Sequence, residues 1–356
     1  MNSSDALARL AAFGLPGADS APITVDSLGD LLELAQARLA LSWLSDAVAA
    51  GLVENVTPEF LQALSTRHMS ALTTTMAAHA VVVKTVNRLR EAGWTDLRVL
   101  KGCATGHLDY ARPTDRFSSD VDLLVSTGDQ AMLAQVFSVE KFPVPRRRRW
   151  QERYSKETAI VSEYGVELDL HVTIGDGYFG LVIPPDELRR HTESFEIAGT
   201  EMTAFDGPGR LLHAAIHIGY GHYNLNSTRD VLQLTLVTEV DWREAIDRAA
   251  RWKVDGLMAQ GVRRAFNELV VEPHPILDWA ERHRTSGRQR VAVHLLGNRE
   301  RGYYLTGVAA LPVYRWPGYI GPLLLPSREY LREADLQLSA RTKRLVKEVS
   351  TLVRRG

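Results

Sequence analysis

The chain has 356 residues, 45% of them hydrophobic, and is therefore long enough to bury sizeable cores in about two to three domains. Its 42 lysine and arginine residues nearly balance its 43 aspartate and glutamate residues, which argues against a protein built for extensive binding of polyanions. The single cysteine, Cys103, excludes an intramolecular disulfide bond and a cysteine-based zinc site, and it fits a reducing compartment.

The N-terminus and the hydrophobic pattern predict a cytoplasmic protein. Residues 1–17 lack the basic region and the long apolar segment of a secretory signal peptide, so we expect none. No stretch approaches the ~20 consecutive apolar residues of a transmembrane helix, so we expect no membrane partner.

Residues 1–95 are predicted to form an N-terminal helical region. Ser27 precedes a helical pattern that runs over 28–51 and ends in glycine. Thr57 and Pro58 are typical of a helix N-cap followed by a first-turn proline, and Gly93 closes that region. Neither segment contains an evident group of reactive side chains, so we expect both to serve packing.

Residues 96–205 change to a pattern of short strands and predict an α+β core. A helix is expected over 128–139. The expected strands cover 96–102, 120–125, 157–174 (two strands joined near Tyr164 and Gly165) and 195–205 (a hairpin around Gly199).

Residues 206–356 are predicted to form a C-terminal helical domain. Helical patterns cover 209–223, 227–240 and 241–254, a segment rich in proline and glycine interrupts them at 311–327, and a charged helix follows over 331–355. The predicted fold class is therefore α+β, with a small mixed sheet flanked by helical segments.

Two expected strands carry acidic residues in matching phase. Asp120 and Asp122 point to the same side of their strand, because alternate residues share a face, while the valine and leucines between and after them point to the other. In the segment ELDLH, Asp169 and His171 share a face with Glu167 in the same way. If the two strands are neighbours, Asp169 completes a triad with Asp120 and Asp122.

Three carboxylates in one place repel one another unless a hard cation neutralises them. Mg²⁺, or Mn²⁺ in its place, is the expected cation because it takes oxygen ligands and keeps phosphate partners. Taken alone, an Asp-x-Asp strand is also typical of solvent-facing positions, so this alternative stays open.

The motifs together resemble the nucleotidyltransferase superfamily of DNA polymerase β-like fold, and more narrowly its bacterial branch of uncharacterised nucleotidyltransferases. Lys101-Gly102, Asp120-x-Asp122 and the segment ELDLH at 167–171 carry the resemblance. Looser similarity at 211–234 and 323–333 extends it over most of the chain from about residue 60 onward.

The resemblance implies a nucleoside triphosphate, with ATP expected, held through Mg²⁺ on Asp120 and Asp122. Asp169 would be the general base or a ligand of a second metal ion, and Gly102 would form the turn over the triphosphate. Transfer of a nucleoside monophosphate to an acceptor would release diphosphate. Cys103 stands where the common Gly-Ser motif supplies a hydroxyl, so Lys101 or an arginine would have to compensate.

Several further residues allow two interpretations each. Arg116 suits triphosphate oxygens better than Arg112, although both also fit exposed loop positions. Lys101 either contacts phosphate or pairs with an aspartate. His171 either reaches substrate or holds Asp169.

The arginine run Arg146–Arg149 could steer an anionic ligand but is also typical of a solvated loop. His213 and His217 share a helical face but lack the glutamate of a zinc motif, which favours packing or acceptor contacts over a metal. By resemblance, His222, Tyr223 and Asp230 would line the cleft.

Three functions remain open from the sequence. The first is a metal-dependent nucleotidyltransferase, whose acceptor is expected to be a small molecule, a peptide or a protein rather than RNA. The second is a catalytically degenerate nucleotide-binding or interaction protein of the same fold. The third is a toxin-like enzyme that modifies tRNA.

Overall fold

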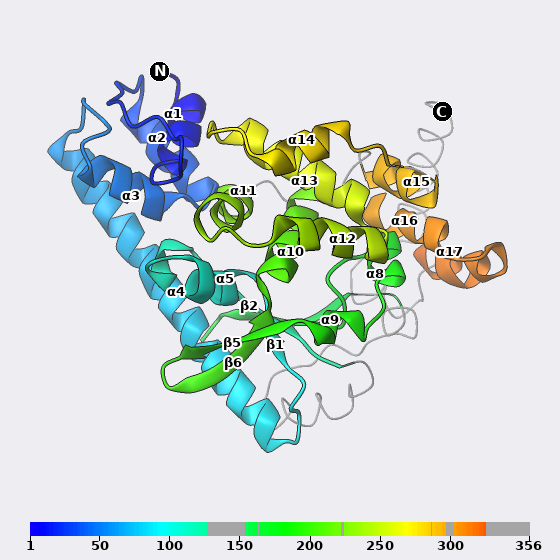
Figure 1. Cartoon of the computed structure of the whole chain (residues 1–356). Helices are drawn as coiled ribbons and strands as arrows, with labels where there is room; N and C mark the ends of the chain where they lie inside the picture. The colour runs from blue at the N-terminus through cyan, green and yellow to red at the C-terminus, as the bar shows by residue number, and fades with distance from the viewer. Residues whose placement is uncertain are drawn as a thin grey trace.

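The structure is a computed structural model that describes residues 1–126, 154, 156–162, 164–221, 224–285, 287–296 and 302–324. Two small sheets lie below a large group of helices, and the long helix α4 runs along one side of the molecule (Figure 1). The predicted α+β class, with a small mixed sheet flanked by helices, is confirmed.

The N-terminal helices begin where the sequence predicts. They are α1 (Ser3–Ala11), α2 (Leu28–Ala37), α3 (Leu41–Ala49) and α4 (Pro58–Glu91). The hydroxyls of Ser27 and Thr57 accept hydrogen bonds from backbone N–H groups in the first turns of α2 and α4, as N-caps do. The single helix expected over 28–51 is instead two helices, because Leu39 adopts a left-handed conformation (φ 58°) that ends the first one.

Four strands form a mixed sheet in the order β1-β2-β4-β3. They are β1 (Arg98–Val99), β2 (Asp120–Leu124), β3 (Glu157–Val161) and β4 (Glu167–His171). Strands β2 and β4 are parallel, and the other two pairs are antiparallel. The strand expected over 96–102 is shorter than predicted, because residues from Lys101 onward form helix α5 (Lys101–Asp109).

A separate hairpin consists of β5 (Thr192–Ile197) and β6 (Thr200–Phe205), which confirms the predicted turn at Gly199. Its turn needs residues with positive φ, and Gly199 has φ 77°. Short helical segments connect the strands: η1 (Pro113–Asp115), α8 (Gly177–Val182) and α9 (Glu187–Arg190).

The C-terminal part is helical, as predicted. It contains α10 (Gly207–Gly219), α11 (Leu225–Leu232), η2 (Gln233–Val237), α12 (Trp242–Trp252), α13 (Asp255–Glu268), α14 (Pro275–Arg282), α15 (Gly287–Leu296), α16 (Gly302–Ala310), η3 (Val313–Arg315) and α17 (Trp316–Leu324). The interruption predicted at 311–327 is therefore partly wrong: Pro317 lies in the first turn of α17, where a missing backbone N–H costs nothing. The predicted helices at 128–139 and 331–355, and the arginine run, lie outside the described residues.

One face of the four-stranded sheet packs on α4. Their buried side chains form a single core, which includes Val82 and Val86 of α4, Val121 and Leu123 of β2, and Leu168 and Leu170 of β4. These strand residues alternate with the acidic ones, so the carboxylates point to the opposite face. The apolar half of each strand thus fixes the side from which the carboxylates project.

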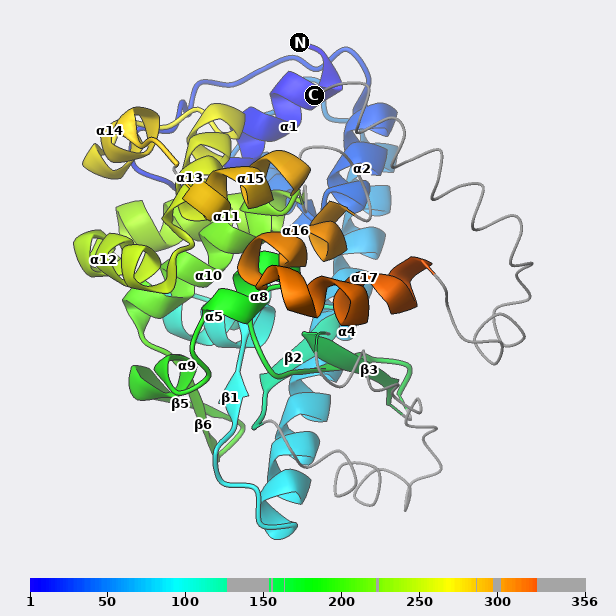
Figure 2. The same ribbon diagram turned by 90° about the vertical axis from the view of Figure 1, so that its right-hand side faces the viewer.

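A second core joins the N-terminal helices to the C-terminal helical part. It unites Leu7, Leu31 and Leu44 of the N-terminal helices with Leu212, Leu257 and Val262 of the C-terminal ones. In both views α1 lies beside the C-terminal helices, at the end of the molecule away from β5 and β6 (Figures 1 and 2). An ion pair between Arg38 and Glu268 links the same two parts. The predicted domain boundaries at 95 and 205 stay a prediction.

Among the described helices, none is both long enough and apolar enough to cross a lipid bilayer.

The crossing of α10 and α13 depends on a glycine. A Cβ atom on Gly261 would overlap the carbonyl oxygen of Ala215, so only glycine permits this approach of the two helices. We expect Gly261→Ala to lower the free energy of unfolding by about 1–3 kcal/mol, as overpacking does. Urea denaturation would measure the change.

Gly29→Ala is the matched control, because the nearest atom to its new Cβ would be 4.0 Å away on Ser27. This variant should be unchanged or more stable by up to about 1 kcal/mol. Equal stability of Gly261→Ala and the wild type would contradict the close crossing.

Candidate active site

The parallel pairing of β2 and β4 brings the two acidic motifs together. Asp122 lies directly opposite Asp169, and Asp120 lies opposite Glu167. The predicted neighbourhood of the two strands is therefore confirmed. Oxygen or nitrogen atoms of Asp122, Asp169 and His171 lie within 4.8 Å of one another and could hold a metal ion.

Asp120 begins β2 on the same face and is not a member of this group of three. Burial raises the pKa of Asp120, and repulsion from Asp122 adds to the effect. Asp120 and Asp122 therefore repel each other electrostatically. Its role as a metal ligand stays a prediction.

Asp122 is buried yet well supplied with partners. Its Oδ1 accepts hydrogen bonds from the Lys101 ammonium and from Nε2 of His171, which is 2.7 Å away. Burial disfavours the charge on Asp122, but Lys101 and His171 outweigh it and hold its pKa well below the usual range. Asp122 is therefore an ionised, fixed carboxylate.

Asp169, by contrast, has a carboxylate oxygen without a hydrogen-bond partner in the described part of the chain. Its Oδ1 is buried and has no hydrogen-bond partner among the described residues. Burial, followed by repulsion from Glu157 and Asp122, raises the pKa of Asp169 to about 7. A buried acceptor without a donor carries a free-energy penalty that a cation would remove.

The donor set fits Mg²⁺. Asp122 and Asp169 offer carboxylate oxygens, which this ion prefers. His171 is better suited to orienting Asp122 through their hydrogen bond than to binding a hard cation. Burial lowers the pKa of His171, which keeps its ring neutral in this role.

Three residues near this centre were not predicted. Glu157 of β3 lies opposite His171, with its Oε2 3.4 Å from Nε2 of that ring. Lys156 pairs with Glu157 at 2.9 Å and reaches Asp176 at 3.8 Å. The sequence showed only that Glu157 begins an expected strand. The register of β3 on β4 places Glu157 opposite His171, and no local pattern predicts that register.

The turn between β1 and α5 differs from the expected glycine turn. Lys101, not Gly102, has the left-handed backbone (φ 44°), a strained conformation that is common at functional sites. Gly102 lies inside α5, and a Cβ there would overlap Ser118. Glycine at 102 therefore permits close packing against the loop before β2. Contact of Gly102 with a triphosphate stays a prediction.

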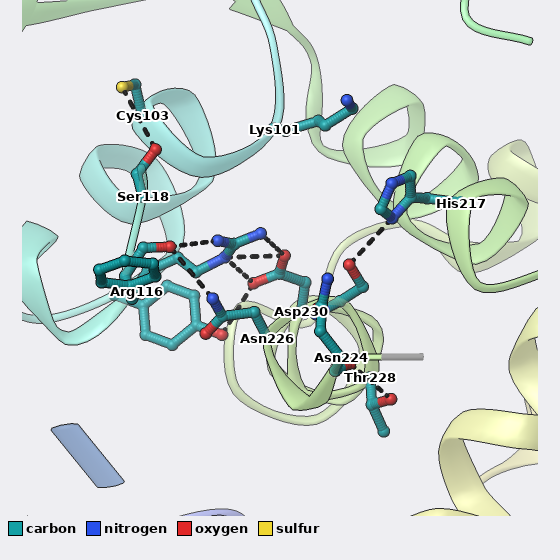
Figure 3. Close-up of polar contacts among 12 residues, drawn as sticks. Lys101, Cys103, Arg116, Ser118, His217, Asn224, Asn226, Thr228 and Asp230 are labelled. Carbon is teal, nitrogen blue, oxygen red and sulfur yellow. Dashed lines mark hydrogen bonds and ion pairs between the residues drawn. The ribbon is translucent and has the colours of Figure 1, made fainter. Parts of the chain in front are cut away.

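The Cys103 thiol does not take the place of a phosphate-binding hydroxyl in this structure. It is buried in the core between α5 and the sheet, 3.9 Å from the Ser118 hydroxyl (Figure 3). Burial raises its pKa to about 12, so the thiol remains protonated and unreactive.

Arg116 is buried, and its guanidinium binds Asp230 of α11 through two nitrogens at 2.8 and 3.0 Å (Figure 3). The Tyr110 hydroxyl donates a further hydrogen bond to the same carboxylate at 2.9 Å. Arg112 is exposed and pairs with Asp46 and Asp115. The predicted binding of Arg116 to phosphate stays a prediction, and the structure shows that Asp230 already holds this side chain.

A cavity lies between α5, α10 and α11, and its wall includes Lys101, the residue that contacts Asp122. Its polar lining consists of Lys101, Thr105, Arg116, Arg210, His213, His217, Ser227 and Asp230. The sequence pointed to His213, His217 and Asp230, and the cavity brings them together with Lys101. His222 and Tyr223 lie outside the described residues.

Residues 27–267 match the model of a protein family described as "Uncharacterised nucleotidyltransferase". Because this match spans more than half of the chain, the protein belongs to that family of nucleotidyltransferases. No curated protein matches the chain.

Among solved structures, the chain is similar to the crystal structure of an antigenic nucleotidyltransferase-like protein from Paracoccidioides brasiliensis. The similarity covers 55% of this chain and 93% of the other, with 15% sequence identity and a TM-score of 0.33.

The Arg116–Asp230 pair is expected to be essential for stability. Asp230→Ala would leave a buried guanidinium without its carboxylate, which typically costs about 3–5 kcal/mol. Asp278→Ala is the control, since Asp278 and its partner Arg282 are exposed and such pairs contribute about 0–1 kcal/mol. Chemical denaturation would compare the two, and similar losses for both variants would contradict a structural role of the buried pair.

Asp169 is expected to make stability depend on pH when no metal is present. Its pKa is about 7 in the folded protein and near 3.8 without the fold, so the folded state holds the proton more tightly. The free energy of unfolding should therefore fall as pH rises from about 4 to about 7 and change little above that. Asp169→Asn should remove this fall and stabilise the protein at pH 8 by on the order of 1–2 kcal/mol.

Thermal unfolding in EDTA at several pH values would measure this effect. Added Mg²⁺ should raise the melting temperature of the wild type and leave Asp169→Asn nearly unchanged. A stability difference between the two proteins that is the same at pH 4 and pH 8 would contradict the assignment.

Proposed function

We propose that the protein transfers a nucleoside monophosphate, with ATP as the expected donor, to an acceptor nucleophile and releases diphosphate. One observation carries this proposal: an ionised, hydrogen-bonded Asp122 stands opposite an Asp169 whose buried oxygen has no partner. Membership of the nucleotidyltransferase family supports it. Two such carboxylates on adjacent strands form a site suited to a divalent cation and its phosphate ligands.

Asp122 and Asp169, with Asp120 beside them, would hold Mg²⁺ or Mn²⁺. Such an ion, when bound, neutralises charge on phosphate oxygens. Lys101 stands at the start of α5 with its ammonium on Asp122, where it can also bind a phosphate oxygen. Because Leu100 at the N-cap has no polar side chain, the first backbone N–H groups of α5 are suited to an anion as well.

Asp169 is the proposed general base. This role is the alternative to direct metal binding: without a cation the pKa of Asp169 is about 7, which suits a group that removes a proton from the acceptor, whereas a cation bound to its carboxylate would lower that pKa. His171 would act as a positioning residue, since its hydrogen bond fixes the carboxylate of Asp122. The acceptor is expected to be a small molecule, a peptide or a protein.

The position of Cys103 favours a second candidate function, nucleotide binding without turnover. Its buried thiol leaves the phosphate site without the hydroxyl of the common Gly-Ser motif. In that case the protein would bind a nucleoside triphosphate and serve as an interaction module.

The test is incubation of the protein with each α-labelled nucleoside triphosphate, Mg²⁺ and a panel of acceptors. Diphosphate release and nucleotidyl adducts found by mass spectrometry would be the readouts. Asp122→Asn and Asp169→Asn should each lower turnover by about 100-fold or more, the usual effect of removing a general base or a key electrostatic group.

The control is Asp186→Asn, an exposed carboxylate outside the site, which should leave turnover unchanged. Equal turnover by wild type, Asp122→Asn and Asp169→Asn would refute the proposed catalysis at these two carboxylates. Nucleotide binding with no turnover for any acceptor would favour the binding module instead.

A further inference from the structure

Strand β3 is an edge strand with one open side. It is the last strand in the order β1-β2-β4-β3, and in the part of the chain that the structure describes its one strand partner is β4. At the start of this ladder the carbonyl oxygen of Lys156 accepts a hydrogen bond from the N–H of Val172. Because residues that bond to the partner strand alternate with residues that do not, the backbone groups of Ala159 and Val161 point away from β4.

This outer edge of β3 is open to pairing with another backbone. The N–H and C=O groups of Ala159 and Val161 have no hydrogen-bond partner among the described residues, and both side chains are exposed. Edge strands are usually protected by a charged residue, a proline or a bulge. Between Thr158 and Val161 the strand has no charge and no proline, and its register with β4 is unbroken.

An extended peptide is the ligand that matches this edge. The free donors and acceptors repeat with the period of a β-strand, and another extended backbone offers complementary groups at the same spacing. Val161 and Tyr164 add apolar surface at the end of the strand, since 59% and 62% of them are exposed. These side chains suit the apolar residues of a bound peptide segment.

The open edge lies beside the carboxylates. Ala159 is paired with Asp169, so the two side chains project from the same face of the sheet. A strand added to β3 would lie two strand spacings from β4, which is about 10 Å. The side chain between them at this position is the single methyl group of Ala159, so a long side chain of the peptide can lie across it toward Asp169.

Tyrosine is the residue whose side chain fits this position. The hydroxyl groups of serine and threonine stay close to their own backbone and cannot cross a neighbouring strand. Lysine is long enough, but its ammonium group has no lone pair at neutral pH. The phenol of tyrosine is long, uncharged at neutral pH and keeps lone pairs on its oxygen.

We infer that the free edge of β3 binds an extended segment of the acceptor by strand addition, and that a tyrosine of this segment, placed opposite Ala159, receives the nucleotide. This inference rests on the proposed nucleotidyl transfer and narrows its acceptor to a peptide or protein. The phenol oxygen bonds to the α-phosphorus while the bond from that phosphorus to the bridging oxygen of the β-phosphate breaks. Diphosphate leaves with the bonding electrons, and Asp169, in its role as the base, takes the phenol proton.

The test uses each α-labelled nucleoside triphosphate, Mg²⁺ and a library of short blocked peptides with a central tyrosine and varied flanking residues. Matched libraries carry phenylalanine, serine or lysine at the centre. The tyrosine library should be labelled and the other three should not, and mass spectrometry should find the nucleotide on the phenol.

Two proline variants test the edge itself, with the best peptide as substrate. Ala159→Pro and Val161→Pro each remove an outward N–H and fill the gap with a ring, while the hydrogen bonds to β4 remain. Each should raise KM for the peptide by about 10-fold or more, because a backbone hydrogen bond is lost and the added strand is pushed away. The kcat should change much less, since the carboxylates are untouched.

Ser194→Pro is the matched control. Ser194 is exposed on β5, and its N–H also points outward, because His191 and Asp206 form a hydrogen-bonded pair in that hairpin. This variant should keep the KM of the wild type, and circular dichroism would verify the folding of all three variants.

Three results would overturn this inference alone. They are equal labelling of the serine or lysine library, an unchanged KM in both β3 variants, and turnover with another acceptor but with no peptide. Sedimentation would also detect a wild-type dimer that Ala159→Pro dissociates, which would assign the edge to a second copy of the chain instead. Absence of turnover with every acceptor would overturn the proposed function together with this inference.

Discussion

The structure depends on the in-register pairing of β2 with β4. It sets two carboxylates, Asp122 and Asp169, side by side in a partly buried place, where their mutual repulsion opposes folding. Lys101 and His171 stabilise one of them and leave the other without a partner. This difference between the two carboxylates creates the site. Asp122 is a fixed anion, whereas the Asp169 oxygen without a partner among the described residues can bind a cation or a proton.

The rest of the fold holds that arrangement in place from both sides. The core on α4 fixes the apolar face of the sheet. On the acidic side, α10 places His213 near the carboxylates, and the N-terminal helices pack with α10 and α13 in a common core. The N-terminal helices and α13 thus stabilise α10, the helix that forms one wall of the cavity.

Buried ion pairs join the helical part to the sheet. Asp230 of α11 holds Arg116 from the loop before β2, and Arg210 of α10 holds Asp109 at the end of α5. Each of these arginines is buried, so its carboxylate partner is needed to offset the cost of desolvation. The same pairs line or border the cavity between α5, α10 and α11, so both of its arginines already have carboxylate partners.

The sequence by itself determined the class of fold, the two acidic strands and the helix starts at Ser27 and Thr57, because alternation and capping are local properties of the chain. Tertiary structure alone decided that Glu157 joins the site, that Asp230 holds Arg116, and that Cys103 faces the core. Those outcomes depend on strand register and on which helices meet. Residues far apart in the chain set both, and no local pattern encodes them.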